Sequence, residues 1–177
     1  MLHLALLRHA EALPLAEGGD LDRPLSPSGL EMAERMGRYF RSANLVPDLV
    51  LISPARRTRE TFEGLEQGAT QKFKAEVVPA LYSASLETLE AILAEQPKEV
   101  SFLLVIGHNP GLAELANGLV GKGKKAELTK MRDHFPTPCL ALIDFDAKSW
   151  KKVALGHGHL EVFLPRAALA KSAAGGP

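Results

Sequence analysis

The chain has 177 residues, which is the size of one domain and allows about 70% of the unfolded surface to be buried. Basic and acidic residues number 21 each, so no excess charge points to nucleic acid or to an anionic membrane as a partner. The single cysteine, Cys139, excludes an internal disulfide framework, and no run approaches the roughly 20 apolar residues of a membrane span. These features predict a cytoplasmic protein.

Apolar runs typical of strands alternate along the chain with helical patterns. Strands are expected at residues 2–7, 48–52, 75–78, 100–106, 139–145 and 151–155. Apolar side chains at helical spacing are found around residues 30–40, 58–65, 86–93 and 112–119. Three helix starts are expected where an N-cap residue precedes proline, at Ser26-Pro27, Ser53-Pro54 and Asn109-Pro110.

This alternation predicts a three-layer α/β/α sandwich with a mostly parallel central sheet. The last two expected strands are close in sequence and predict an antiparallel edge. Residues 14–24 are expected to form a polar loop, and residues 121–138 a basic, proline-containing connection. A single domain is expected over residues 1–166, followed by a flexible tail at residues 167–177.

Basic and imidazole side chains stand at the ends of three of these strands. The first strand ends in Arg8-His9, the second leads into Ser53 and Arg57, and the fourth ends in Gly107-His108. The carboxyl ends of parallel strands share one edge of a sheet, where ligands of open α/β sheets bind. We therefore expect two arginines and two histidines to converge there.

Arg57 differs from the arginines beside it. Arg56 and Arg59 each have a glutamate four residues further on, which fits pairing on a solvated helix face. Arg57 has a threonine at that spacing. A cation near a helix N-terminus is unfavourable unless an anion also binds there, so Arg57 is a candidate anion ligand.

The converging residue types suit phosphoryl transfer. The donor fork of arginine matches phosphate oxygens, and a neutral imidazole can attack phosphorus to form a covalent phosphohistidine. A second imidazole, if protonated, stabilises the charge on the phosphoryl oxygens. Such a site needs no metal or cofactor. His157 and His159 resemble a metal-ligand pair, but no third ligand stands at typical spacing and no metal site is expected.

Three segments together resemble the histidine phosphatase (phosphoglycerate mutase-like) superfamily. Arg8-His9-Ala10-Glu11 resembles its Arg-His-Gly-Glu signature, and residues 53–61 resemble its Ser-Pro-x-x-Arg-Ala-x-Gln-Thr segment. Gly107-His108 matches its late histidine. The short length and four segments, one of which extends Gly107-His108, resemble the compact SixA-type phosphohistidine phosphatase branch: Asp22-Arg23-Pro24-Leu25, Leu81-Tyr82, Gly107-His108-Asn109-Pro110-Gly111 and Phe135-Pro136-Thr137.

The resemblance implies a phosphatase whose nucleophile is His9. Arg8, Arg57 and His108 would bind and stabilise the phosphoryl oxygens, with assistance from Arg23. The position of Asn109 next to His108 adds its backbone N–H as a further expected phosphate donor. The implied substrate is a phosphorylated protein carrying phosphohistidine, or else a small phosphate ester.

The chain departs from the family pattern at three positions. Ala10 and Thr58 replace glycine and alanine, and Ala80 stands about where many relatives place a glutamate as general acid. An imidazole leaving from phosphohistidine is far less basic than an alkoxide and takes its proton from solvent, so the missing acid favours a phosphoramidate substrate. We expect Glu11, Asp20 and Asp22 to contribute little to proton donation.

Two other functions fit the same residues. One is a phosphomonoesterase acting on a small metabolite; a mutase fits less well, because it must shield its phosphoenzyme from water. The other is a non-catalytic module that binds a phosphorylated ligand. The basic stretch of Lys122, Lys124, Lys125 and Lys130 is typical of a solvated loop, and also suits an acidic partner.

Overall fold

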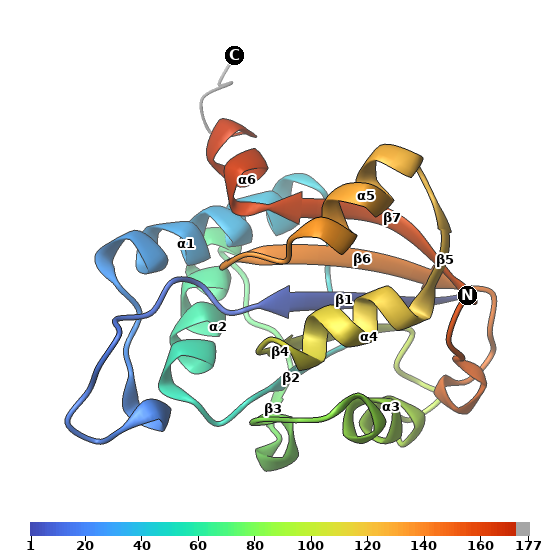
Figure 1. The fold of residues 1–177 in the computed structure, drawn as a ribbon, viewed down its shortest axis with the longest axis horizontal. Helices are drawn as coiled ribbons and strands as arrows, with labels where there is room; N and C mark the ends of the chain where they lie inside the picture. Colours follow the sequence, from blue (N-terminus) through green and yellow to red (C-terminus); the bar gives the residue numbers. More distant parts are fainter. Residues whose placement is uncertain (173–177) are drawn as a thin grey trace.

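A computed structural model describes residues 1–172 of the chain. Seven strands form one sheet through the middle of this part, in the order β3-β2-β4-β1-β6-β7-β5 (Figure 1). The strands are β1 (Leu2–Arg8), β2 (Leu49–Ile52), β3 (Ala75–Val77), β4 (Phe102–Gly107), β5 (Val120–Gly123), β6 (Cys139–Phe145) and β7 (Gly158–Pro165).

The sheet is mostly parallel, as predicted. Strands β1 to β4 are mutually parallel, and β5 runs parallel to β7. The antiparallel strand is β6, which pairs with both β1 and β7. It therefore lies inside the sheet, and β5 rather than an antiparallel strand forms the edge on that side.

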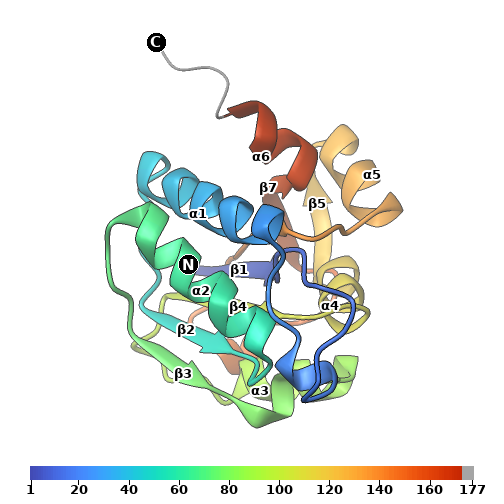
Figure 2. The same ribbon diagram turned by 90° about the vertical axis from the view of Figure 1, so that its left-hand side faces the viewer.

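Helices cover both faces of the sheet and complete the three predicted layers (Figure 2). They are α1 (Pro27–Ser42), α2 (Arg56–Ala69), α3 (Leu86–Ala94), α4 (Gly111–Leu119), α5 (Lys125–Asp133) and α6 (Arg166–Ser172). Short 3-10 turns span Asp20–Asp22, Pro79–Leu81 and Trp150–Lys152. No helix of the described part is long and apolar enough to cross a membrane.

Strand β1 separates the two hydrophobic cores by simple alternation. Leu4 and Leu6 face the core under α3 and α4, whereas Ala5 and Leu7 face the core under α1, α2 and α6. All four side chains are fully buried. Because side chains alternate across a strand, a strand covered on both faces must be apolar throughout. The strand therefore holds its carboxyl end, at Arg8, rigidly between the layers.

The prediction of a strand at residues 151–155 is wrong. This segment begins in the 3-10 turn Trp150–Lys152, and the last strand is β7. Trp150 is 1% exposed, and its indole Nε1–H donates to the carbonyl of Val100 at 2.7 Å. The buried ring holds a compact turn here, although the apolar residues that follow it are typical of a strand.

Two segments expected to lack regular structure contain it. The connection at residues 121–138 includes most of β5 and all of α5. Residues 166–172, most of which were assigned to a flexible tail, form α6, where Leu169 is 1% exposed and packs in the core with α1. The rest of the predicted tail, residues 173–177, lies outside the described residues.

One of the three predicted N-caps is confirmed. The hydroxyl of Ser26 accepts from the backbone N–H of Gly29 at 3.0 Å. The other two are wrong, because α2 begins at Arg56 and α4 at Gly111. The side chains of Ser53 and Asn109 are used elsewhere: Ser53 contacts His108, and Asn109 donates to a backbone carbonyl.

Candidate active site

The carboxyl ends of β1, β2 and β4 meet at one edge of the sheet. The backbone N–H of His9 donates to the carbonyl of Gly107 at 3.1 Å, and that of Ser53 donates to Ile106 at 3.1 Å. The rings of His9 and His108 lie with their centroids 5.3 Å apart. The structure thus brings Arg8, His9, Arg57 and His108 together, as the strand-end pattern predicts.

His9 is held as a neutral imidazole with a defined tautomer. Its side chain is buried, and Nδ1 lies 2.6 Å from the carbonyl oxygen of Ala10. A carbonyl only accepts, so Nδ1 carries the proton and Nε2 carries the lone pair. Burial lowers the pKa of His9 to about 3, against the opposing effect of the Ala10 hydrogen bond, and the nearby His108 and Arg57 lower it further. At neutral pH the ring is therefore uncharged, and its Nε2 lone pair is free to form a bond.

The backbone after His9 is tied to α2. The N–H of Ala10 donates to Oγ1 of Thr61 at 2.9 Å, and that hydroxyl donates to the carbonyl of Arg57 at 2.7 Å. Thr61 is fully buried. These contacts fix His9 relative to Arg57, which follows the end of another strand.

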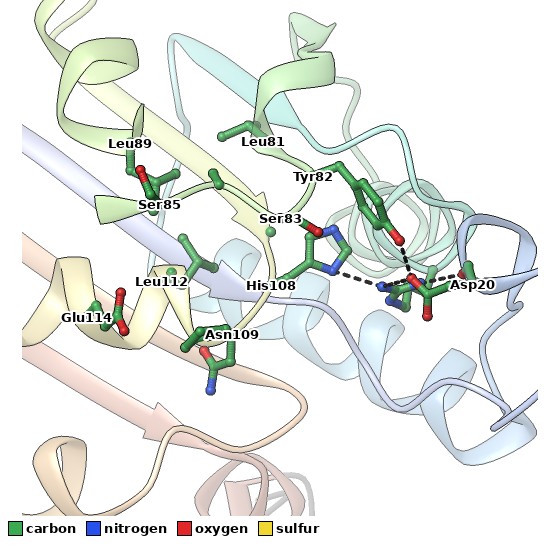
Figure 3. Close-up of a pocket in the computed structure, with 15 residues that line it drawn as sticks. Asp20, Leu81, Tyr82, Ser83, Ser85, Leu89, His108, Asn109, Leu112 and Glu114 are labelled. Atoms are coloured by element: carbon green, nitrogen blue, oxygen red, sulfur yellow. Dashed lines mark hydrogen bonds and ion pairs between the residues drawn. The ribbon is translucent and has the colours of Figure 1, made fainter. Parts of the chain in front are cut away.

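Arg57 finds its carboxylate partner in the loop between β1 and α1. Its Nη1 donates to the backbone carbonyl of Asp20 at 2.7 Å, and its Nη2 lies 3.1 Å from Oδ2 of Asp20. Tyr82 donates to the same Oδ2 at 2.5 Å (Figure 3). Nε of Arg23 forms an ion pair with Oδ1 at 3.1 Å. The acid that helical spacing offers Arg57 is Glu60, three residues on, and Glu60 pairs with Arg56 instead. The partner from the loop gave no such signal, so sequence reasoning missed it.

Neither nearby carboxylate is set up as a proton donor. The hydrogen bond from Tyr82, together with Arg57, lowers the pKa of Asp20. Hydrogen bonds from Ser26 and Arg166 lower the pKa of Glu11, which thereby joins α1 to α6. Both groups are ionised at neutral pH. Ala80 is exposed in the turn Pro79–Leu81 and brings no acid of its own.

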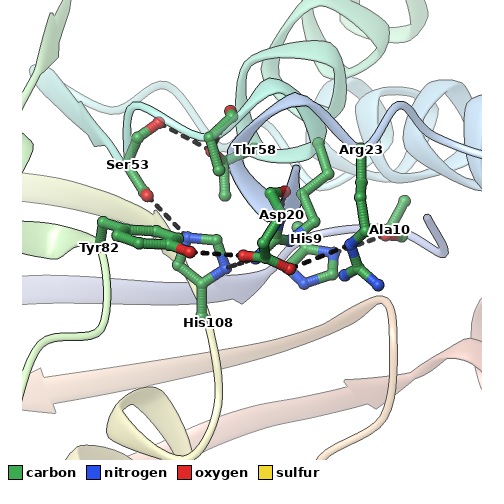
Figure 4. A network of polar contacts seen from close by, with 10 residues as sticks. His9, Ala10, Asp20, Arg23, Ser53, Thr58, Tyr82 and His108 are labelled. Atoms are coloured by element: carbon green, nitrogen blue, oxygen red, sulfur yellow. Dashed lines mark hydrogen bonds and ion pairs between the residues drawn. The ribbon is translucent and has the colours of Figure 1, made fainter. Parts of the chain in front are cut away.

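His108 is also neutral, and two neighbours orient its ring. Nη2 of Arg57 lies 3.3 Å from Nδ1, and Oγ of Ser53 lies 2.6 Å from Nε2 (Figure 4). A guanidinium only donates, so Nδ1 accepts and Nε2 carries the proton toward Ser53. Burial, followed by Arg57, lowers the pKa of His108 to about 4. The protonated form considered from the sequence is therefore not the form of the free site at neutral pH.

Arg8 and Asn109 converge on one backbone carbonyl. Nη1 of Arg8 donates to the carbonyl of Phe135 at 2.7 Å, and Nδ2 of Asn109 donates to the same oxygen at 3.0 Å. Within residues 1–172, Arg8 and Arg57 each keep a buried Nε–H without a hydrogen-bond partner. Buried unsatisfied donors are rare, and here they lie beside an anion-favouring cluster. This donor set fits an anion with several oxygens, such as a phosphoryl group.

Sequence reasoning missed two contributors besides Asp20. Ser53 is fully buried and contacts His108, but its position before a proline suggested a helix cap instead. Tyr82 was noted only within a segment that resembles the family, with no role assigned to it. Its ring meets that of His108 edge-on, with the centroids 5.6 Å apart. The available signal for Ser53 is a hydroxyl at the end of a strand that neighbours the strand ending in a histidine.

The described residues contain no group of three or more His, Cys, Asp or Glu side chains that could hold a metal ion. His159 instead lies 2.6 Å from a carboxylate oxygen of Glu161. The positive charge at the site comes from Arg8, Arg57 and Arg23.

Known proteins resemble this chain in sequence and in fold. The sequence model of the histidine phosphatase superfamily (branch 1) matches residues 4–99. An uncharacterised chloroplastic protein of Arabidopsis thaliana is 33% identical over 135 residues, covering 69% of this chain and 61% of that protein. An uncharacterised protein of Mycobacterium tuberculosis is 31% identical over 163 residues, covering 90% of this chain and all of that protein.

Among solved structures, one from Nakamurella multipartitia, provisionally named a phosphohistidine phosphatase SixA, superposes with a TM-score of 0.80. It is 26% identical, and the match covers 93% of this chain and 95% of that one. The family match spans more than half of the sequence and includes Arg8, His9 and Arg57. The chain therefore belongs to the histidine phosphatase superfamily.

Proposed function

We propose that this protein removes phosphoryl groups through a covalent intermediate on His9, and that its substrate is phosphohistidine on another protein. One observation carries the proposal: the buried, uncharged imidazole of His9 keeps a lone pair on Nε2 within a cluster of arginine donors. A neutral nucleophile and cationic oxygen ligands are what a two-step phosphoryl transfer requires.

The first step makes one bond and breaks one. The Nε2 lone pair forms a bond to phosphorus while the bond to the leaving nitrogen breaks and its electron pair departs with that nitrogen. The other nitrogen of the substrate ring carries a proton taken from water, so the ring departs as neutral imidazole. Arg8 and Arg57 hold the negatively charged oxygens, and we propose that Arg23 and the backbone N–H of Asn109 assist them.

The second step returns the enzyme to its starting state. Water attacks phosphorus, the bond from phosphorus to Nε2 of His9 breaks, and inorganic phosphate leaves. A phosphoryl dianion favours the charged form of a nearby imidazole, so it raises the pKa of His108. His108 then takes up a proton and donates it in a hydrogen bond to a phosphoryl oxygen.

The ionised state of the two carboxylates beside the site supports a substrate with a nitrogen leaving group. Ala80 offers no proton, and Asp20 and Glu11 are ionised by their partners. An alkoxide leaving group gains much from a general acid, whereas imidazole leaves without one. The Nakamurella multipartitia protein, which is provisionally named for phosphohistidine, supports the same substrate class.

The decisive experiment traps the intermediate. The protein is mixed with a phosphohistidine-containing protein, quenched within milliseconds in alkali, digested and mapped by mass spectrometry. We expect phosphate on His9, none in His9→Ala, and unchanged labelling in the control His157→Ala. The reaction should proceed in EDTA, because the arginines supply the positive charge.

A panel of substrates separates this function from its alternatives. Higher kcat/KM on a small phosphate ester than on phosphohistidine protein would assign the protein as a metabolite phosphomonoesterase. Phosphate binding without turnover, in both the wild-type protein and His9→Ala, would assign a non-catalytic binding module. Full activity in His9→Ala would overturn the nucleophile assignment.

A further inference from the structure

A cleft of about 430 Å³ leads away from the candidate active site (Figure 3). It begins at Arg57 and His108, follows the segment at residues 81–85 and ends beside the first turns of α4. A volume of this size is typical of small-molecule sites, which span about 300–1,000 Å³. His9 is not among the lining residues, so the cleft lies beside the phosphoryl site and can hold what the phosphoryl group is attached to.

The wall nearest the site is apolar and aromatic. The Tyr82 ring meets His108 edge-on, with centroids 5.6 Å apart and planes at 87°. Leu89 and Leu112 are buried and form the floor. At Gly111 a Cβ atom would lie 2.6 Å from the carbonyl oxygen of Ala84, so the two sides approach closely because this residue has no side chain. A flat ring of the size of imidazole suits such a wall.

The charges of the cleft are unequal at its two ends. Near the phosphoryl site, Arg57 is paired with Asp20. At the far end lies Glu114, an exposed residue of α4 that forms no ion pair within residues 1–172 (Figure 3). Arg57 is the lone cation among the lining residues. The far end therefore favours a cationic group and disfavours a carboxylate.

We propose that this cleft binds the leaving group, with the phosphohistidine ring against Tyr82 and a basic side chain next to it in the sequence paired with Glu114. The proposal rests on the proposed function and adds a specificity to it: phosphohistidine flanked by lysine or arginine. It also predicts low activity on small phosphate esters that carry a carboxylate, because the carboxylate would face Glu114.

Two matched phosphohistidine peptides test this specificity, one with lysines and one with glutamates beside the phosphohistidine. The wild-type protein should have the higher kcat/KM on the lysine peptide. Glu114→Gln should lower that preference by about two- to fivefold, the range that single exposed ion pairs give. Glu114→Lys should reverse it. The preference should also shrink in high salt, which screens exposed charges.

Two controls isolate the cleft. Glu63→Gln removes an exposed acid on α2, outside the cleft, and should leave the preference unchanged. Inhibition by inorganic phosphate should be about equal in the wild-type protein and Glu114→Gln, because the phosphoryl ligands are untouched. Equal kcat/KM on both peptides in the wild-type protein and Glu114→Lys overturns the cleft assignment and leaves the proposed function standing. Hydrolysis of neither peptide overturns both.

Discussion

The hydroxyl oxygen of Ser53 lies 2.6 Å from Nε2 of His108, and this contact joins the ends of two neighbouring strands. Because Arg57 donates to the other ring nitrogen, Nε2 carries the proton and Ser53 accepts it. Ser53 is fully buried, so no water replaces it readily. The serine therefore sets the tautomer and the orientation of His108, and it is a positioning residue rather than a helix cap.

Ser53→Ala should slow catalysis without unfolding the protein. Removing the acceptor leaves a buried Nε2–H unsatisfied and releases the ring, and a penalty of about 1–3 kcal/mol of this kind predicts a loss of about tenfold or more in kcat. Turnover of p-nitrophenyl phosphate measures the loss, and ¹⁵N NMR of the imidazole reports the tautomer. An unaltered tautomer with unaltered kcat would show that Ser53 has no positioning role.

Asp20→Asn should retain most of the activity. The Tyr82 hydrogen bond and Arg57 lower the pKa of Asp20, so the carboxylate is not a proton donor at neutral pH. We expect kcat within about tenfold of the wild-type value, since a general acid contributes about 10²–10⁴-fold. Removing this negative charge beside Arg57 should also strengthen inhibition by inorganic phosphate a few-fold. A loss of a hundredfold or more in kcat would instead make Asp20 the acid.

The two buried imidazoles should make folding stability depend on pH. Unfolded histidine has a pKa of about 6.5, whereas burial lowers the pKa values of His9 and His108 to about 3 and about 4. Between these values the unfolded chain binds more protons, so the free energy of unfolding falls as the pH falls below about 6.5. The slope per imidazole is about 1.4 kcal/mol per pH unit. Above pH 7 both states are neutral and this contribution is constant.

Urea unfolding between pH 4 and 7 checks this dependence. Carboxylates titrate at the acid end of the range, so the informative quantity is a difference between proteins. The double variant His9→Asn, His108→Asn should lose stability less steeply than the wild-type protein on acidification. Parallel curves for the two proteins would contradict the lowered pKa values.

Gly68→Ala should destabilise the fold. A Cβ atom there would lie 1.9 Å from the carbonyl oxygen of Glu34, where α1 and α2 pack together. Overpacking costs about 1–3 kcal/mol, which exceeds the roughly 1 kcal/mol that alanine gains over glycine in a helix. The matched control is Gly118→Ala in α4, whose Cβ would meet one flexible leucine methyl at 3.0 Å. Denaturant unfolding should show a loss in the first variant and none in the second.

The central part of the fold is predictable because buried strands must be apolar. Strands β1, β2, β4 and β6 are covered on both faces or pack on a core. Their runs of apolar residues therefore predict them directly from the sequence. Strand β5 is different, since Lys122 projects from an exposed edge where charge is tolerated. The segment after Trp150 gives the opposite error, because its apolar residues resemble a strand while the buried Trp150 ring holds a turn there.

The same reasoning explains what was predictable in the site. The carboxyl ends of parallel strands lie at the same edge of a sheet, so the strand pattern predicts that Arg8, His9 and His108 meet there. The contact between Asp20 and Arg57 does not, because a loop residue gives no periodic signal of where it folds back. Tyr82 reaches the site in the same unpredictable way, from the segment that follows a 3-10 turn.

One backbone oxygen atom in the connection between β5 and β6 holds two groups of the site. The carbonyl of Phe135 receives hydrogen bonds from both Arg8 and Asn109, so the backbone at this position orients two groups of the site at once. Most side chains upstream in α5 are exposed. A chimaera can therefore exchange this connection for one of another length and alter the exposed positions of α5 widely. It must still place a backbone carbonyl where Arg8 and Asn109 can donate to it, before β6 begins.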